Sequence, residues 1–179
     1  MSDAPSAEEL ARVEPFAGLP APDAASARAA LQVRELAAGE TLFAEGEAGY
    51  SAFVLVSGAV ETRRQLPGGG GDWRLQTLRA VALFGEIPLL LDHPRSVTAQ
   101  AVEPSRVWEI CRESLEAALS AGEPWAGRFL LALGRSLCRR LLAVESGLAL
   151  AFEELAAEQV PVRRQELRAI EQRLSQWLY

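Results

Sequence analysis

The chain has 179 residues, of which 49% are hydrophobic and 23% charged, and its formal net charge is −6. This length suits one domain with extra helices, and this composition excludes wholesale disorder. The acidic balance argues against a nucleic-acid binder, and the single histidine, His93, excludes enzymes whose metal site needs several histidines.

The start of the sequence predicts a mobile segment and no targeting signal. Residues 1–13 are acidic and polar and lack the basic and apolar regions of a secretory signal. A short helix is expected around Ala24–Leu31, and no uncharged apolar stretch reaches the roughly 18 residues of a membrane span. Cys111 and Cys138 are isolated thiols, which we expect to be small buried hydrophobes in a reducing cytoplasm.

From Gln32 to about Ile110 the sequence predicts short antiparallel strands separated by turns. Apolar and polar residues alternate in Val60–Arg63 and in Trp73–Leu78, which is the pattern of half-buried strands. No lysine follows the four glycines at 68–71, so they indicate a hairpin tip and not a phosphate loop. Closely spaced strands of this kind favour a sandwich or a roll.

Helices are expected after the strands. A short helix is predicted over Arg112–Leu119, and Pro124 begins a long one that ends at Val160–Pro161. An apolar stripe at three- and four-residue steps predicts its packing face. The stripe consists of Leu130, Leu133, Leu137, Leu141 and Val144. A last helix is predicted over 162–179, with Leu167, Ile170, Leu174 and Trp177 on one face.

The stretch FGEIPLLLDHPRSVTA at 84–99 combines two opposite charges with a dense apolar run. Gly85 permits unusual backbone dihedrals, and Glu86 begins a predicted helical turn whose free N–H groups suit an anion. The planar guanidinium of Arg95 matches the paired oxygens of a phosphate. The carboxylate of Glu86 accepts hydrogen bonds without donating any, which suits a sugar hydroxyl. Together these groups suit a small nucleotide.

This stretch resembles the phosphate-binding cassette of cyclic nucleotide-binding domains, which occur in catabolite activator proteins, protein kinase regulatory subunits and nucleotide-gated channels. The matching residues are Phe84, Gly85, Glu86, Leu89, Pro94, Arg95, Ser96 and Thr98. Upstream, ELAAGETLFAEGEAGYSAFVLVSGAV is similar to the opening strands of that family. The resemblance implies a mainly β fold, an antiparallel β-roll (a double-stranded β-helix or jelly roll), with an N-terminal helix, a short cassette helix and long C-terminal helices.

Three regions are expected on this basis. Residues 1–13 form a mobile N-terminus, residues 14–145 form the cyclic nucleotide-binding-like domain with its lid helix, and residues 146–179 form a helical extension. The extension is too short for a winged helix-turn-helix, so the resemblance extends to the sensor domain of the DNA-binding relatives and not to their DNA-binding part.

The resemblance also implies roles for individual residues. Glu86 would bind the ribose 2′-hydroxyl, Arg95 would pair with the cyclic phosphate, and backbone amides near both would add contacts. The predicted ligand-binding residues are Phe84, Gly85, Glu86, Ile87, Arg95, Ser96 and Val97. Pro88 departs from the pattern, because it lacks the N–H that alanine, serine or glycine supplies there, and Val97 replaces a common alanine. Ser96 is compatible with cAMP in some members and with cGMP in others.

The implied function is a cytoplasmic, bacterial sensor or adaptor that binds cAMP or cGMP and has no metal and no catalytic activity. Its C-terminal helices would signal to a protein partner or form a homodimer, with no nucleic-acid and no membrane partner. The base is expected to meet the long helix, where Arg140, Val144 and Glu145 are candidate contacts. The alternative is a nucleotide-independent scaffold with a degenerate pocket, in which Glu86 and Arg95 persist as an ion pair.

Overall fold

The computed structural model describes residues 4–66 and 70–157, with residues 151–157 as backbone. The chain divides into two units, Met1–Gly134 and Arg135–Tyr179. The first unit contains every strand of the described chain, and the long helix α5 (Pro124–Ala157) begins in the first unit and continues into the second. The helix predicted over 162–179 lies outside the described residues.

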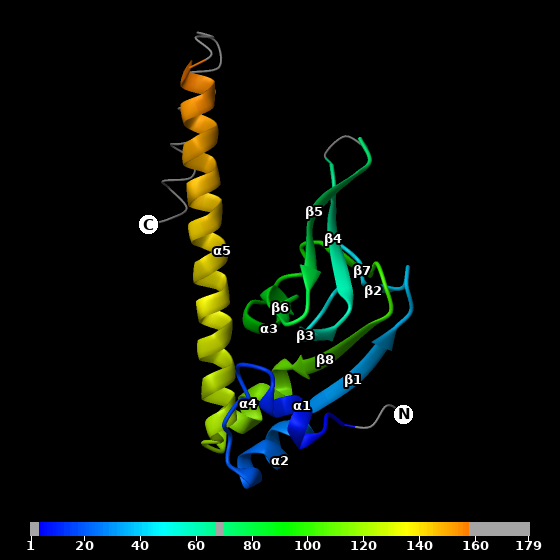
Figure 1. Cartoon of the computed structure of the whole chain (residues 1–179), viewed down its shortest axis with the longest axis vertical. Helices are drawn as coiled ribbons and strands as arrows, with labels where there is room; N and C mark the ends of the chain where they lie inside the picture. The colour runs from blue at the N-terminus through cyan, green and yellow to red at the C-terminus, as the bar shows by residue number, and fades with distance from the viewer. Residues whose placement is uncertain (1–3, 67–69, 158–179) are drawn as a thin grey trace. The chain divides into compact units, whose positions relative to one another are not determined.

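The strands of the described chain form two antiparallel four-stranded sheets (Figure 1). Sheet 1 has the order β1–β8–β3–β6, and sheet 2 has the order β2–β7–β4–β5. The strands are β1 Leu31–Leu36, β2 Thr41–Phe43, β3 Ser51–Ser57, β4 Ala59–Gln65, β5 Asp72–Arg79, β6 Ala82–Phe84, β7 Thr98–Ala101 and β8 Ser105–Cys111. The predicted antiparallel β-roll is therefore confirmed.

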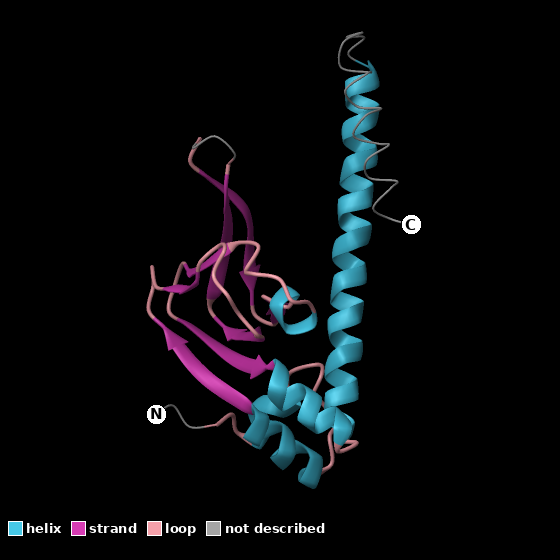
Figure 2. Cartoon of the chain, turned by 180° about the vertical axis from the view of Figure 1, so that it is seen from behind, coloured by secondary structure: helices cyan, strands magenta, loops and turns pink. Residues whose placement is uncertain are grey.

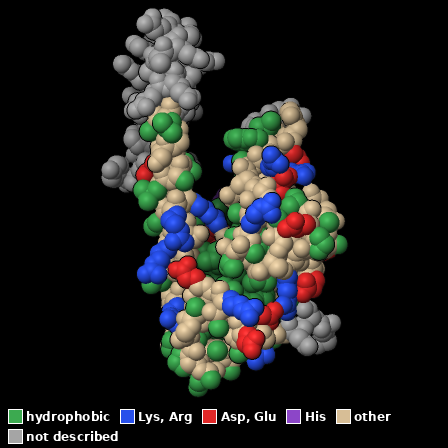
Figure 3. Space-filling view, viewed as in Figure 1, with side chains coloured by type: hydrophobic (Ala, Val, Ile, Leu, Met, Phe, Trp, Pro, Cys, Tyr) green, Lys and Arg blue, Asp and Glu red, His purple; other side chains and the backbone are tan. Residues whose placement is uncertain are grey.

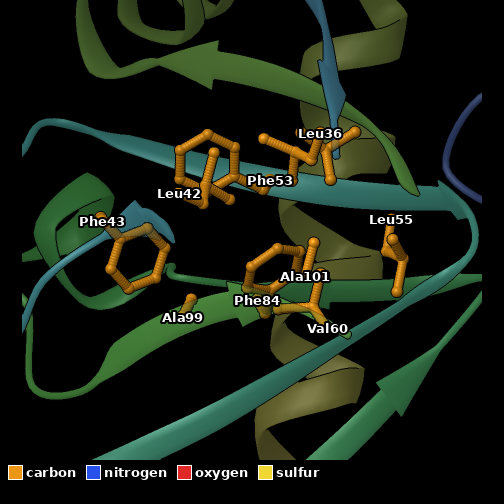
Figure 4. Packing of buried hydrophobic residues seen from close by; sticks show 10 residues of the cluster. Leu36, Leu42, Phe43, Phe53, Leu55, Val60, Phe84, Ala99 and Ala101 are labelled. Carbon is orange, nitrogen blue, oxygen red and sulfur yellow. The ribbon is translucent and has the colours of Figure 1, made fainter. Parts of the chain in front are cut away.

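Aromatic and aliphatic side chains from both sheets fill the core of the roll (Figure 4). Three phenylalanines gather in it: the ring centroid of Phe53 lies 5.6 Å from those of Phe43 and Phe84. Residues Ala52–Leu55 of β3 are at most 1% exposed, because the face of this strand that points away from the core is covered as well.

Helices cover that outer face of sheet 1. Helices α1 (Ala7–Ala11), α2 (Ala21–Ala30), α4 (Arg112–Ser120) and the first turns of α5 gather at one end of the roll (Figure 2). Phe16, in the connection between α1 and α2, lies with its ring centroid 6.1 Å from that of Trp108 on β8 and 6.4 Å from that of Trp125 on α5. These rings join the N-terminal segment, the sheet and α5 into one packed unit.

The structure differs from the sequence prediction at the N-terminus. We expected residues 1–13 to be mobile, but α1 forms there, with Ser6 and Glu9 in a reciprocal capping box and Leu10 only 1% exposed. The sequence contains a local indication of this helix, because serine followed three residues later by glutamate is the capping-box pattern.

The packing face of α5 also differs from the predicted stripe. Leu133 of the stripe is buried at 1% exposed, whereas Leu141 is 49% and Val144 66% exposed. Other buried side chains of α5 are those of Trp125, Ala126, Phe129 and Ala132. The cysteines were predicted to be buried, and this is wrong: Cys111 is only half-buried, and Cys138, on α5, is exposed. None of the described helices combines the length and the apolar character needed to cross a membrane.

The strand predictions around the glycines are confirmed. β4 and β5 form a hairpin in which Ala59 pairs with Arg79 at one end and Gln65 pairs with Asp72 at the other. Part of the hairpin tip, 67–69, lies outside the described residues. Glu61 on β4 is 6% exposed, and Arg63 and Arg74 pair with its carboxylate. β5 is an edge strand exposed along most of its length.

Candidate functional site

The cassette begins where β6 ends. Gly85 follows β6 with a φ of +69°, a backbone conformation that other residues rarely adopt. A Cβ at this position would lie 3.1 Å from Arg95 Nη1 and 3.1 Å from Phe53 Cδ2, so the close approach of neighbours also requires glycine. The turn therefore brings the backbone of the cassette into contact with Arg95.

A short helix follows this turn. α3 (Ile87–Leu90) has Glu86 at its N-cap, and Glu86 is 6% exposed. Pro88 is buried at the second helical position, where the amide of another residue would have no partner inside the helix. The first turn of α3 can present the N–H of Ile87 to an anion, but Pro88 contributes none.

Arg95 lies inside the molecule, 5% exposed. Its Nη1 donates to the backbone oxygens of Ser51, at 2.7 Å, and of Gly85, at 2.8 Å. Its Nη2 donates to the hydroxyl of Ser51 at 2.9 Å. The side chain thus connects β3 to the cassette turn, using three of the five N–H groups of a guanidinium in hydrogen bonds within the described chain.

Aromatic rings and distant carboxylates complete the surroundings of Arg95. Its guanidinium carbon lies 4.3 Å from the ring centroid of Phe43 and 5.2 Å from that of Phe53. Burial lowers the pKa of Arg95 from its ordinary value, and the charges of Glu109 and Glu47 act in the opposite direction. An ion pair between Glu86 and Arg95 remains a prediction.

Backbone hydrogen bonds fasten the cassette to the loop between β2 and β3. The amide of Arg95 donates to the carbonyl of Glu47 at 2.8 Å, and the amide of Gly46 donates to the carbonyl of Arg95 at 2.8 Å. A Cβ at Gly49 would lie 2.6 Å from Arg95 Nε. A glycine is therefore needed at 49 for the loop to pass so close to the guanidinium.

A polar chain continues from Arg95 across sheet 1. Ser51 accepts from Arg95 and donates its own hydroxyl proton to Glu109 Oε1 at 2.6 Å. Glu109 in turn accepts from Arg34 Nη1 on β1 at 3.4 Å. Three strands therefore contribute to the orientation of one arginine, and sequence reasoning had identified neither Ser51 nor Glu109.

The other predicted site residues lie around this arginine at different depths. Phe84 is 2% exposed within the core cluster, Val97 packs against that cluster, and Ser96 is half-buried. The fold thus brings Gly85 and Arg95 into direct contact, and it places Phe84 in the core cluster and Val97 against that cluster. Ligand contacts by these residues remain predictions.

Arg112 is a further residue of the cassette that sequence reasoning missed. At the start of α4, it donates from Nη2 to the carbonyls of Pro88 and Leu91, the latter at 2.7 Å, and from Nε to that of Leu89 at 3.0 Å. Its guanidinium lies 5.4 Å from the ring centroid of Tyr50. A cation at these carbonyls caps the C-terminal end of α3, and no local pattern in the sequence indicates it.

The remaining polar candidate is His93. It is exposed, and its Nδ1 lies 2.7 Å from the carbonyl oxygen of Pro94. Within the described ranges, no three His, Cys, Asp or Glu side chains come together in a way that could hold a metal ion. Arginine and acidic side chains are interspersed over the face of the roll seen in Figure 3.

Residues 33–121 match the family model described as the cyclic nucleotide-binding domain. The curated relatives include the CRP-like cAMP-activated global transcriptional regulator of Mycobacterium tuberculosis, which is 31% identical over 142 residues. That alignment covers 79% of this chain and 61% of the relative, so the chain spans about three fifths of the regulator's length.

Two solved structures are similar over most of the chain. The N-terminal domain of a transcriptional regulator from Streptomyces coelicolor has 29% identity and a TM-score of 0.59, covering 78% of this chain and 94% of that one. The catabolite activator protein of Thermus thermophilus has 26% identity and a TM-score of 0.62, covering 82% of this chain and 72% of that one. The range matched by the family model, 33–121, includes the cassette.

Proposed function

Because residues 33–121 belong to the cyclic nucleotide-binding domain family, we propose that this chain binds cAMP or cGMP and acts as a sensor or adaptor. The observation that carries the proposal is the contact between Arg95 Nη1 and the carbonyl of Gly85, at 2.8 Å. This hydrogen bond joins Arg95 and Gly85, the two residues that the cassette pattern assigns to the phosphate, and Glu86 directly follows Gly85 in the sequence.

Arg95 has the chemistry to receive the cyclic phosphate. Its acceptors in the described chain are neutral carbonyl and hydroxyl oxygens. A phosphate oxygen is a stronger acceptor, since charge-assisted hydrogen bonds are roughly twice as strong as neutral ones. The burial of Arg95 strengthens this attraction further, because a charge with little water around it is weakly screened. We propose that Glu86 accepts a hydrogen bond from the ribose 2′-hydroxyl.

The signal is proposed to leave through the C-terminal helices, toward a protein partner or a second copy of the chain. The second unit carries exposed apolar side chains on α5: Leu141, Leu142, Val144 and Leu150, between 49% and 66% exposed. Large exposed apolar side chains gathered on one helix are typical of interaction surfaces. Base contacts by Arg140, Val144 and Glu145 remain predictions. The free thiols of the described chain fit a reducing compartment, and we propose a cytoplasmic location.

A nucleotide-independent scaffold is the second candidate, and Pro88 favours it. The buried proline removes an N–H that could hold a phosphate, and one lost hydrogen bond to a charged group is worth about 1.5–3 kcal/mol. Arg95 also has protein acceptors without any ligand. In this case Arg95 would serve the fold by joining β3 to the cassette turn.

Calorimetric titration with cAMP and with cGMP separates the two candidates. We expect micromolar binding of at least one nucleotide, and a loss of about tenfold or more in Arg95→Lys, which keeps the charge but lacks the planar fork. Glu86→Gln tests the ribose contact, and Arg79→Lys, at a side chain that is 75% exposed, is the matched control. No binding and no thermal stabilisation at millimolar nucleotide would reject the sensor and leave the scaffold.

A further inference from the structure

A cavity of about 210 Å³ lies between the N-terminal segment and the outer face of sheet 1. The side facing α1 consists of Glu9, Arg12 and Val13, and the sheet contributes Ser57, Arg106 and Trp108. A single water needs only about 10–15 Å³ of such space, whereas sites for drug-sized ligands have about 300–1,000 Å³. The cavity is therefore large enough for a small organic molecule.

Two buried N–H donors in its wall make no hydrogen bond to the described residues. The indole nitrogen of Trp108 has no hydrogen-bond partner within the described chain, although the residue is 0% exposed. The same holds for Nε of Arg106, which lies 2.9 Å from Glu35 Oε1 but without the geometry of a hydrogen bond. Buried donors are nearly always paired, so two unpaired ones at one cavity need an explanation.

The strand geometry makes these two donors neighbours. Arg106 and Trp108 are two residues apart on β8, so both side chains leave the same face of sheet 1. Val107 between them faces the core of the roll. Ser57 on β3 pairs directly with Arg106, so its hydroxyl is available beside the guanidinium. Three groups that can donate hydrogen bonds therefore stand together on the floor of the cavity.

The charged groups at the cavity leave one arginine available for an anion. Arg12, Arg106 and Glu9 line it, and Arg106 pairs both with Glu9 and with Glu35, the latter at 2.9 Å. The carboxylate of Glu9 is already occupied, since it accepts from the amide of Ser6 at 2.7 Å and from Arg106 Nη1. Arg12 is exposed, and no ion pair of the described residues involves it. Among the described residues, Arg12 is therefore the arginine of this cavity that an added carboxylate could pair with.

We propose that this cavity is a binding site for a small carboxylic acid with an apolar body. Its carboxylate accepts hydrogen bonds from Trp108 Nε1 and Arg106 Nε and pairs with Arg12. Its apolar body packs against Val13 and Val81, which also line the cavity. The site is separate from the cassette and does not depend on nucleotide binding, so either proposal can fail without the other.

Benzoate is a suitable probe, and benzamide is its neutral control of the same shape. The full chain labelled with nitrogen-15 is titrated with each, and the indole N–H signals are followed; Trp108→Phe identifies the signal of Trp108. We expect a saturable downfield shift of that signal with millimolar benzoate, and binding of benzamide weaker by about tenfold, because only the carboxylate strengthens the hydrogen bonds.

Variants test which groups are responsible. Trp108→Phe removes the N–H and keeps most of the ring, and we expect a loss of about tenfold in benzoate affinity by calorimetry. Arg12→Gln, at an exposed position, should weaken binding even if Trp108→Phe is unstable. Trp73→Phe, on the exposed hairpin, should bind as the parent chain does. Absence of a saturable shift, equal affinity for benzamide, or full affinity in Arg12→Gln would overturn the proposal and leave a cavity that holds only water.

Discussion

Replacing Pro88 by alanine should increase cyclic nucleotide affinity while lowering stability. Pro88 is the second residue of α3, in the turn whose amides point away from the helix toward a potential phosphate. Alanine restores one N–H there, and a hydrogen bond to a charged group contributes about 1.5–3 kcal/mol. Since about 1.4 kcal/mol corresponds to a factor of ten, the affinity should rise at least about tenfold.

The same change should weaken the fold. Pro88 is buried, and alanine lacks two of its ring methylenes, each worth about 0.8 kcal/mol of burial. The more flexible unfolded chain removes a further 0.4–1 kcal/mol or so. Together these terms predict a free energy of unfolding lower by about 2 kcal/mol. The carbonyl at residue 88, which accepts from Arg112, is present in both variants.

Calorimetry with cAMP and cGMP measures the affinity, and urea unfolding measures the stability. Pro124→Ala is the matched control, because Pro124 is exposed at the first position of α5 and far from the cassette in sequence. Its nucleotide affinity should equal that of the parent chain. A destabilised Pro88→Ala with unchanged nucleotide affinity would refute the reasoning, because the restored amide would then not reach the ligand.

Three further predictions concern the fold around the two sites. Arg112→Gln should lower the free energy of unfolding by about 1–3 kcal/mol and speed amide exchange at Leu91, because α3 loses its C-terminal cap. Urea unfolding and hydrogen exchange measure these effects, and Arg128→Gln, at an exposed arginine of α5, is the control. Gly85→Ala should destabilise the chain more than Gly39→Ala in urea unfolding. Both glycines have a positive φ, but only Gly85 has neighbours within 4 Å of the added Cβ. Equal losses of stability would show that these close neighbours do not matter. Hydrogen bonds from the amide and the hydroxyl of Ser6, followed by the charge of Arg106, lower the pKa of Glu9 from its ordinary value of 4.5. The stabilisation from the ionised Glu9 is complete above pH 4.5 and is lost as the pH falls through the lowered pKa of Glu9. Glu9→Gln should therefore be less stable than the parent chain at neutral pH, and the two stabilities should converge in acid. A difference in unfolding free energy that stays constant from neutral to acid pH would contradict this prediction.

Local signals in the sequence identified the cassette and the order of its elements. The turn at Gly85, the helix that begins after Glu86 and the hairpin from β4 to β5 each depend on a few adjacent residues, through a positive φ, an early proline or an alternation of polarity. A pattern of the same kind predicts α1, because Ser6 and Glu9 form its capping box. For such elements the local conformational preference already selects the structure.

Only the tertiary structure identified the partners of the two sites. Ser51 lies 44 residues before Arg95, and Arg112 is separated by 21–24 residues from the carbonyls that it caps. These contacts depend on the register of β3 against β8 and on how closely the loop at Gly49 passes Arg95, and neither leaves a pattern in the sequence. The cavity beside Trp108 has the same origin, because a gap between α1 and a sheet face is set by the packing of distant elements. The sequence by itself thus determined which residues form the cassette, and packing decided what holds its arginine and where a second site could exist.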